Sequence, residues 1–252
     1  EHYDQAITLP NSWKSALVPY FANIPLRTGY QGEARYVLLN DRHKLDTDKH
    51  PQLVQRYAAL AGPLDGQLLE ARLQSTDEQQ AAALTAHGLS ADAHPVIFCP
   101  GAEYGPAKRW PAEYYAELAQ QFGTPEAPVL LLGSPKDAEV GEEIVAASKG
   151  SARNLSGKTS LFEAIDLIAA SRLVVSNDSG LMHVAAALQR PQVALYGSSS
   201  PGYTPPMNAR AQIVSLNVEC SPCFERVCPL GHFKCMREMT PASVAKAAEA
   251  VT

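Results

Sequence analysis

The stretch VVSNDSGLMHVAAALQRPQVALYG, residues 174–197, contains the pattern that decides the fold class. Two mainly apolar segments predict buried strands, 172–176, which begins two residues before the quoted stretch, and 192–197. The Ala-rich segment 180–188 between them predicts a helix. Continuously apolar strands that alternate with helices are typical of a parallel sheet covered on both faces. This stretch therefore predicts an α/β fold.

The same rhythm extends upstream to residue 95. Further strands are predicted at 95–99 and 128–133, and further helices at 112–122, 137–147 and 161–170. In front of another predicted helix, 77–87, the residues from Ser75 to Glu78 resemble a capping box. One regular α/β domain therefore accounts for most of the chain.

Residues 1–74 have a looser pattern. A short predicted strand, 6–9, is followed by Ser12, which can cap a helix that begins at the next residue. Residues 62–75 combine Gly-Pro with mixed polar content, as interdomain linkers do. We therefore predict two domains, 1–74 with the linker and 75–252.

Composition restricts the class of function. The chain has 252 residues, of which 46% are hydrophobic and 19% charged, and this is typical of a globular protein. The net charge of −5 argues against nucleic acid as the main partner. No apolar run approaches the roughly 20 residues that a membrane span needs. The N-terminus has no signal-peptide pattern and no initiator Met, so the chain is expected to be a piece of a longer protein.

Polar, glycine-containing loops follow three of the predicted strands, at 100–108, 133–137 and 177–180. In a parallel sheet, ligands bind beyond the carboxyl ends of the strands. If the three strands are neighbours, these loops face one crevice. The sequence therefore predicts a ligand site at this edge of the sheet.

The loop at 177–180 has the features of an anion site. Asp178 or Ser179 stands at the predicted N-cap, and Gly180 lets a ligand approach the backbone closely. The free N–H groups of the helix and its dipole attract phosphate. Lys108 can add a charge, and His183 lies one turn along the helix, where it can contact a ligand or orient Asp178. The structural alternatives are a simple helix cap, a solvated Lys and a packed His.

Two carboxylates nearby are candidates for binding hydroxyl groups. Glu103 is the one carboxylate in its loop. Acidic residues commonly hold ribose hydroxyls in such folds, so Asp137 is a second candidate. The alternative for Asp137 is that it opens the following helix, where the dipole favours a negative charge.

Four of the five cysteines lie within 16 residues, in CSPCFERVCPLGHFKC. A C-x2-C pair can bind one tetrahedral metal ion, and an iron–sulfur cluster also accepts four thiolates. The remaining spacings match no common zinc signature, and free or partly paired thiols are the alternative. The candidate metal ligands are Cys220, Cys223, Cys228 and Cys235.

Together these segments resemble a known family. PGAEYGPAKRWP (100–111), LLLGSPKDAEVGEEI (130–144), NLSGKTSLFEAIDLIAAS (154–171) and the residues from Asn177 to Pro206 are similar to the lipopolysaccharide heptosyltransferases of glycosyltransferase family 9. Residues 9–41 resemble the same family. The resemblance implies a GT-B fold, that is, two Rossmann-like domains with parallel sheets.

The resemblance also implies an activity. Family members transfer L-glycero-D-manno-heptose from ADP-heptose to the lipopolysaccharide inner core with inversion, without a metal or other cofactor. It implies a cytoplasmic enzyme and leaves open a peripheral contact with the inner membrane. By position, the catalytic residues would be Lys108 and Asp178. The residues implied to bind the nucleotide sugar are Gly101, Ala102, Glu103, Gly133, Ser134, Ser179, Gly180, Leu181 and His183.

One departure from the family pattern concerns the N-terminus. Family members begin with a strand and a Gly-rich loop that carries the proposed general base, and residues 1–40 do not resemble that segment. We therefore expect an incomplete N-terminal domain, and binding of the ADP-sugar with little transfer. The alternatives are another GT-B nucleotide-sugar enzyme, such as an epimerase that prefers uridine, or an inactive nucleotide-binding fragment.

Overall fold

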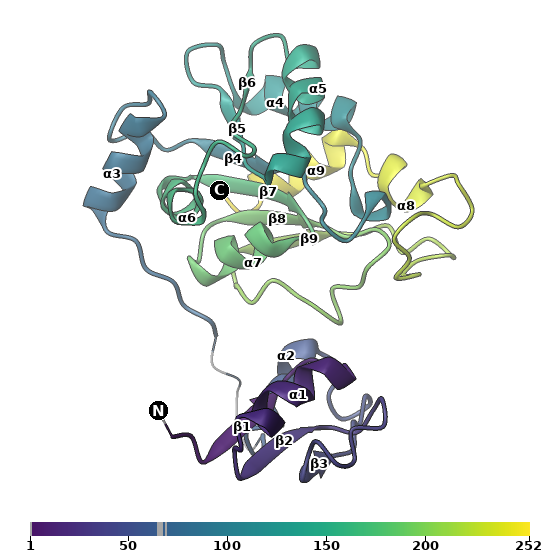
Figure 1. Cartoon of the computed structure of the whole chain (residues 1–252). Coiled ribbons are helices and arrows are strands. Elements are labelled where there is room, and N and C mark those ends of the chain that lie inside the picture. The colour runs from purple at the N-terminus through teal and green to yellow at the C-terminus, as the bar shows by residue number, and fades with distance from the viewer. Residues whose placement is uncertain (1, 65–67, 69) are drawn as a thin grey trace. The chain divides into compact units, whose positions relative to one another are not determined.

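The computed structural model describes residues 2–64, 68 and 70–252 (Figure 1). The chain divides into two compact units, Glu1–Leu69 with Gly202–Thr204, and Glu70–Pro201 with Pro205–Thr252. The predicted linker, 62–75, includes residues 65–67 and 69, which lie outside the described residues.

The first unit contains a small parallel sheet. Its strands have the order β1-β2-β3, and both pairs are parallel. A buried cluster of Ala16, Leu38 and Leu39 forms its core. The elements of this unit are β1 (Gln5–Thr8), α1 (Trp13–Phe21), β2 (Leu26–Tyr30), β3 (Asp41–His43) and α2 (Leu53–Ala58). Ser12 caps α1 as predicted, since its side chain accepts a hydrogen bond from Ser15 N–H.

A buried arginine ties the loops of this unit together. The guanidinium of Arg35, 2% exposed, donates to Pro10 O at 2.8 Å and to Asn11 Oδ1 at 3.0 Å, and it also donates to Tyr30 O. Burial lowers the pKa of this group, and Glu33 partly opposes that effect. Buried charges are tolerated when they are fully hydrogen-bonded, so Arg35 crosslinks the segments before and after β2.

The second unit is built on a six-stranded sheet with the order β6-β5-β4-β7-β8-β9, in which every neighbouring pair is parallel. The strands are β4 (Val96–Cys99), β5 (Val129–Leu131), β6 (Ala152–Asn154), β7 (Leu173–Asn177), β8 (Gln192–Leu195) and β9 (Ala211–Val214). The helices are α3 (Asp77–Ala86), α4 (Ala112–Phe122), α5 (Ala138–Ala147), α6 (Leu161–Ala170), α7 (Gly180–Ala187), α8 (Lys234–Arg237) and α9 (Pro241–Glu249), with 3-10 turns η1 (Pro106–Lys108) and η2 (Pro135–Asp137).

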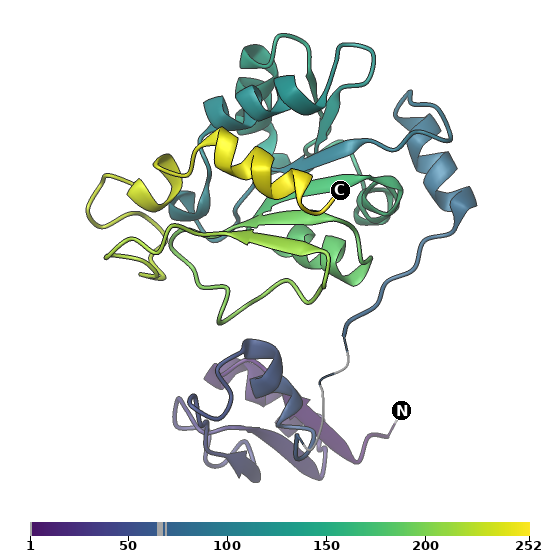
Figure 2. The same cartoon turned by 180° about the vertical axis from the view of Figure 1, so that it is seen from behind.

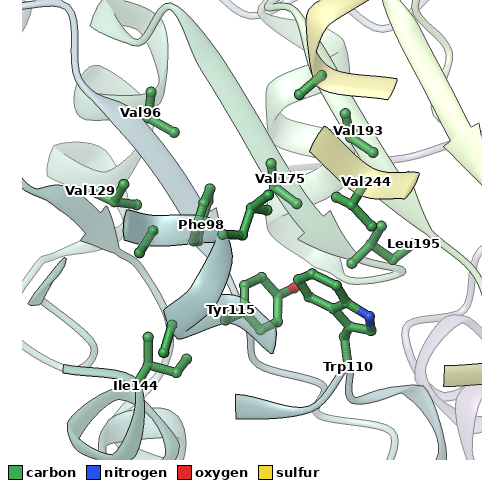
Figure 3. Packing of buried hydrophobic residues seen from close by; sticks show 14 of the residues in the cluster. Val96, Phe98, Trp110, Tyr115, Val129, Ile144, Val175, Val193, Leu195 and Val244 are labelled. Carbon is green, nitrogen blue, oxygen red and sulfur yellow. The ribbon is translucent and has the colours of Figure 1, made fainter. Parts of the chain in front are cut away.

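Helices cover both faces of this sheet, as the uninterrupted apolar strands predict. Alternate residues of each strand point to opposite faces: Phe98 and Val175 pack with α4, α5 and α9 (Figure 3), whereas Ile97 and Val174 pack with α3, α6 and α7. The helices α6 and α7 stand before the sheet in Figure 1, and α4 and α9 stand before it in Figure 2. The predicted α/β class with parallel sheets is confirmed.

The structure corrects one detail of the sequence analysis and adds elements. The capping box of α3 uses Thr76 and Gln79, one residue later than predicted, and Ser75 instead donates to Asp166 Oδ1 at 2.7 Å. The edge strands β6 and β9 and the terminal helix α9 were not predicted. Edge strands are short and partly solvated, so they lack the continuous apolar signal of central strands.

Candidate functional site

Three strand-end loops meet at the carboxyl edge of the large sheet. β5, β4 and β7 are neighbours in the strand order, so the loops that follow them emerge side by side. The expectation that these three strands are adjacent is therefore confirmed. The loop after β4 contains η1, the loop after β5 contains η2, and the loop after β7 leads directly into α7.

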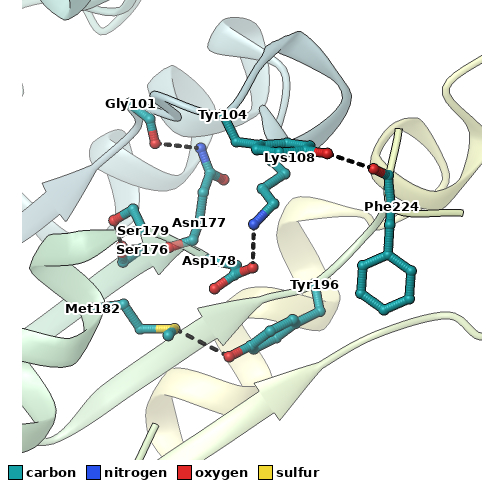
Figure 4. A network of polar contacts seen from close by, with 10 residues as sticks. All are labelled: Gly101, Tyr104, Lys108, Ser176, Asn177, Asp178, Ser179, Met182, Tyr196 and Phe224. Carbon is teal, nitrogen blue, oxygen red and sulfur yellow. Dashed lines mark hydrogen bonds and ion pairs between the residues drawn. The ribbon is translucent and has the colours of Figure 1, made fainter. Parts of the chain in front are cut away.

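An ion pair joins the first and third loops. Lys108 Nζ lies 2.5 Å from Asp178 Oδ2 (Figure 4), and the two side chains are only 17% and 6% exposed. The Lys108 ammonium also stands 5.2 Å from the centre of the Tyr104 ring, within cation–π distance. Because Asp178 and the aromatic ring both hold the ammonium, it is oriented toward the start of α7 before any ligand binds.

The start of α7 presents unpartnered amide groups. Ser179 is the N-cap, but its side chain does not cap the helix and instead shares a hydrogen bond with Ser176 Oγ at 3.1 Å. In the described part of the chain, the amides of Gly180 and Leu181 have no hydrogen-bond partner. A Cβ added at Gly180 would meet no atom within 4 Å outside its own turn of the helix, so the space at the Gly180 Cα is open.

One expected donor is not available. The amide of Asp178 donates to Leu195 O at 3.1 Å, continuing the ladder between β7 and β8. The Asp178 amide is therefore not free to bind a ligand. Asp178 contributes its carboxylate to this site, and the amides begin after it.

Asn177 organises the site, although the sequence analysis gave it no role. Its buried side chain donates to Pro100 O at 2.7 Å and accepts from Tyr115 Oη at 3.1 Å and Trp110 N at 3.3 Å. The end of β7 is thereby fastened to the loop after β4, which carries Lys108. The one sequence signal that could have indicated this role is an Asn directly after an apolar strand, where a buried amide must find hydrogen-bond partners.

His183 lies near the ion pair without bonding to it. Its ring makes no hydrogen bond with the described residues, so the expectation that it orients Asp178 by such a bond is not met. The pKa of His183 is lowered, chiefly because protein atoms displace water from the ring, while Asp178 raises it and Lys108 lowers it further. The His183 residue is exposed, so we expect this pKa shift to have only a small effect on the stability of the fold.

The loop after β4 offers mainly backbone to a ligand. Gly101 and Ala102 are buried, so contacts there would be made by the backbone. Glu103 is exposed and pairs with Lys136 at 2.6 Å, and this hydrogen bond lowers the pKa of the Glu103 carboxyl. Its carboxylate is therefore charged and accessible.

The loop after β5 is rigidly built around Asp137. Asp137 Oδ2 accepts from the amide and the hydroxyl of Ser134, at 2.9 and 2.7 Å. A Cβ added at Gly133 or Gly101 would come within 3.0 Å of the Asp137 side chain, so both glycines are needed for this packing. Asp137 is thus occupied in loop structure, which supports the alternative in which it opens the turn before α5.

The four clustered cysteines and Cys99 are free thiols. Burial raises the pKa of the Cys99 thiol to about 12, so this thiol stays neutral in the core. Among the described residues, no group of three or more His, Cys, Asp or Glu side chains is arranged to hold a metal ion. None of the helices in the described part of the chain has the length and apolar character that a membrane span requires.

Comparison with known proteins gives the family. The sequence model of glycosyltransferase family 9 (heptosyltransferase) matches residues 1–234. The chain belongs to glycosyltransferase family 9. The family resemblance in the sequence is therefore confirmed.

Individual members of family 9 agree with this assignment. Lipopolysaccharide heptosyltransferase 2 of Salmonella typhimurium is 50% identical over 229 residues, which are 86% of this chain and 66% of that protein. The structure of Escherichia coli ADP-heptose LPS heptosyltransferase II matches with a TM-score of 0.89 and 45% identity, over 99% of this chain and 76% of that one. A family 9 structure from Veillonella parvula gives 0.80 and 25%, covering 98% and 73%. These matches confirm the GT-B class, and the chain spans about two thirds of the curated relative's length.

Proposed function

We propose that this chain binds ADP-heptose and transfers the heptose to the lipopolysaccharide inner core. The family and the names of its relatives support the choice of substrates. The observation that carries the proposal is the ammonium of Lys108, held 2.5 Å from Asp178 beside the open N-terminus of α7. A cation and unpartnered amides at one place suit the pyrophosphate of an activated sugar.

The number of hydrogen-bond donors on Lys108 suggests separate roles for Lys108 and Asp178. An ammonium has three N–H donors, and Asp178 takes one of those of Lys108. The other two can reach phosphate oxygens, which the amides of Gly180 and Leu181 bind from the helix side. Asp178 is therefore a positioning residue that keeps the Lys108 ammonium in place, and Lys108 is the residue that contacts the substrate.

The chemistry of transfer follows from this arrangement. As the bond between the sugar and the diphosphate breaks, negative charge grows on the leaving diphosphate, and the acceptor hydroxyl loses its proton to a general base. Lys108 and the α7 amides lie where that charge grows, so they stabilise the transition state more than the ground state. Removal of one such preorganised contact typically raises the barrier by about 3 to 4 kcal/mol.

The neighbouring loops would hold the nucleoside. The exposed carboxylate of Glu103 suits ribose hydroxyls, and the backbone of Gly101 and Ala102 can pack against the sugar–phosphate. Gly133 and Ser134 lie at the end of the adjacent strand and are proposed to contact adenosine by packing, because Asp137 already accepts from both the amide and the hydroxyl of Ser134.

Calorimetric titration with ADP, UDP and inorganic pyrophosphate tests this function. We expect ADP to bind more tightly than UDP, and pyrophosphate to compete with both. Transfer is then followed by mass spectrometry with ADP-heptose and a lipopolysaccharide inner-core acceptor. Preference for UDP would favour an epimerase-like enzyme, and binding of none of the three ligands would contradict the proposal.

A further inference from the structure

The cysteine-rich segment, residues 220–235, encloses a small cavity. The cavity holds about 20 Å³, enough for one water-sized or ion-sized occupant. All four cysteines of the segment line it, together with His232, although they come from different turns of the chain. The complete lining is Ala107, Ser198, Cys220, Cys223, Cys228, Pro229, Leu230, His232, Phe233 and Cys235.

Hydrogen-bond donors lie close to the sulfur atoms of the four cysteines. Phe233 N–H donates to Cys228 Sγ at 3.4 Å, and positive φ angles at Gly231 (70°) and Phe233 (52°) fold the backbone around that sulfur. Ser198 lines the same cavity, is 1% exposed, and its hydroxyl has no hydrogen-bond partner among the described residues. Donors that face sulfur are typical of the surroundings of metal-bound thiolates.

The segment supports the Lys108 loop although it has little regular structure, because only its last two residues belong to a helix, α8. No helix or strand lies between the end of β9 at Val214 and the start of α8 at Lys234 in this fully described stretch. Yet Arg226 O accepts from Ala107 N at 3.1 Å, and Arg226 Nε donates to Tyr104 O at 2.7 Å.

Two further contacts complete this support. Tyr104 Oη donates to Phe224 O at 2.7 Å (Figure 4), and Phe224 N donates to Ser198 O at 2.7 Å, beyond the end of β8. Most of the cysteine-rich segment has neither strand pairing nor helical hydrogen bonds, although it holds the Lys108 loop in place. A crosslink would therefore stabilise this segment more than a regular element.

We propose that Cys220, Cys223, Cys228 and Cys235 bind one thiophilic metal ion, Zn²⁺ or Fe²⁺, and that this ion fixes the segment supporting the Lys108 loop. Four thiolates favour these ions in tetrahedral geometry. The four thiols line one cavity, but among the described residues they are not arranged to hold an ion, so the proposed site requires the segment to rearrange when the ion binds. Each thiol releases its proton to solvent on binding, and no electron is transferred.

Elemental analysis of the full chain, purified without chelators, tests the site. We expect about one zinc or iron per chain, and the element found distinguishes the two ions. After removal of this ion under reducing conditions, titration with Co²⁺ should give thiolate charge-transfer absorption that saturates at one equivalent. Cys228→Ser should lose both signals. Cys99→Ala is the matched control, because Cys99 is buried in the sheet outside the segment, and it should keep them.

Three results would overturn the site. These are absence of metal together with absence of Co²⁺–thiolate absorption, disulfides among the four cysteines in the intact mass of the purified chain, and metal content unchanged in Cys228→Ser. The first two results come from the wild-type chain, so the proposal can be refuted even if Cys228→Ser does not fold.

Hydrogen exchange tests the supporting role separately. Removal of the ion should speed exchange of the Ala107 amide, which donates to Arg226 O, and leave the amides of β7 and β8 unchanged. Equal exchange at Ala107 with and without metal would refute the supporting role even if the ion binds. Neither measurement depends on the sugar donor, so failure to bind ADP would leave this inference standing.

Discussion

At the scale of single residues, the site depends on where one charge is held. Lys108 would be an ordinary surface lysine if Asp178 and Tyr104 did not fix its ammonium. Exposed ion pairs contribute little because water screens them and long side chains lose entropy. This pair is mostly enclosed, so its orientation is maintained, and an incoming phosphate meets a donor that is already in place.

Lys108→Ala tests that role. We expect ADP to bind at least about tenfold more weakly, because a hydrogen bond to a charged group is lost, and turnover to fall by about a hundredfold. Lys246→Ala is the matched control, since Lys246 is exposed on α9 and belongs to none of the three loops. Calorimetry and initial rates measure the two effects, and equal affinities in the two variants would rule Lys108 out.

His183 gives a pH dependence with a definite sign. Its pKa in the folded chain lies below the ordinary value of 6.5, so the unfolded chain binds the proton more readily. The neutral ring therefore contributes stability that is complete above pH 6.5 and is lost as the pH falls through the lower folded pKa. The melting temperature of the wild type should drop slightly more steeply below pH 6.5 than that of His183→Gln, and parallel curves would contradict the shift.

At the scale of elements, the start of α7 is proposed to bind the ligand, whereas the end of β7 stabilises the fold. The helix leaves its first amides open, whereas the strand end is closed by the buried Asn177 network. One substitution in each element separates ligand binding from stability.

Gly180→Ala should weaken ADP binding by about tenfold without unfolding the protein. The new methyl group meets no protein atom within 4 Å, but it stands where a phosphate must approach the amides. Loss of glycine from a helix stabilises it by up to about 1 kcal/mol, so the melting temperature should hold or rise. Gly32→Ala, also in open space, is the control, and unchanged ADP affinity in Gly180→Ala would count against the α7 anion site.

Asn177→Ala should instead destabilise the large unit. It leaves Pro100 O, Trp110 N–H and Tyr115 O–H without their partner, and each buried orphan costs about 1 to 3 kcal/mol. We expect a loss of more than about 2 kcal/mol in urea unfolding, and a smaller loss of about 1 kcal/mol for Tyr115→Phe, which removes one bond. Equal losses in the two variants would show that the network does not act through Asn177.

At the scale of the whole molecule, every residue proposed to bind the donor lies in the second unit. This unit has its own six-stranded sheet with an apolar cluster on each face. A unit with a complete core can fold without the rest of the chain. We therefore expect the second unit to bind the donor without the first unit.

A shortened chain, residues 70–252, should fold cooperatively and keep the ADP affinity of the whole chain. Urea unfolding and calorimetry test the two expectations. An affinity reduced tenfold or more would mean that residues of the first unit contact the nucleotide. A shortened chain that does not fold would contradict the independence of the second unit.

Local sequence patterns were sufficient to predict the central elements of the large unit and the chemistry of its loops. Strands such as 95–99 are uninterrupted runs of apolar residues, and helix signals such as that of 161–170 are local, so both can be recognised without neighbours. Asp178, Gly180 and Lys108 could also be recognised in the sequence, because each stands in a polar loop that follows a predicted strand. The register of the α3 cap was misjudged by one residue, because Ser75 is held by Asp166, 91 residues away.

Only the tertiary structure decided which loops meet. The order β5-β4-β7 brings Lys108 against Asp178 across 70 residues of chain, and it engages the Asp178 amide with Leu195. It also makes Asn177 a junction and places the cysteine segment under the Lys108 loop. These contacts arise from strand pairing and from burial of two helical layers, which depend on the whole chain at once and leave no local trace in composition or periodicity.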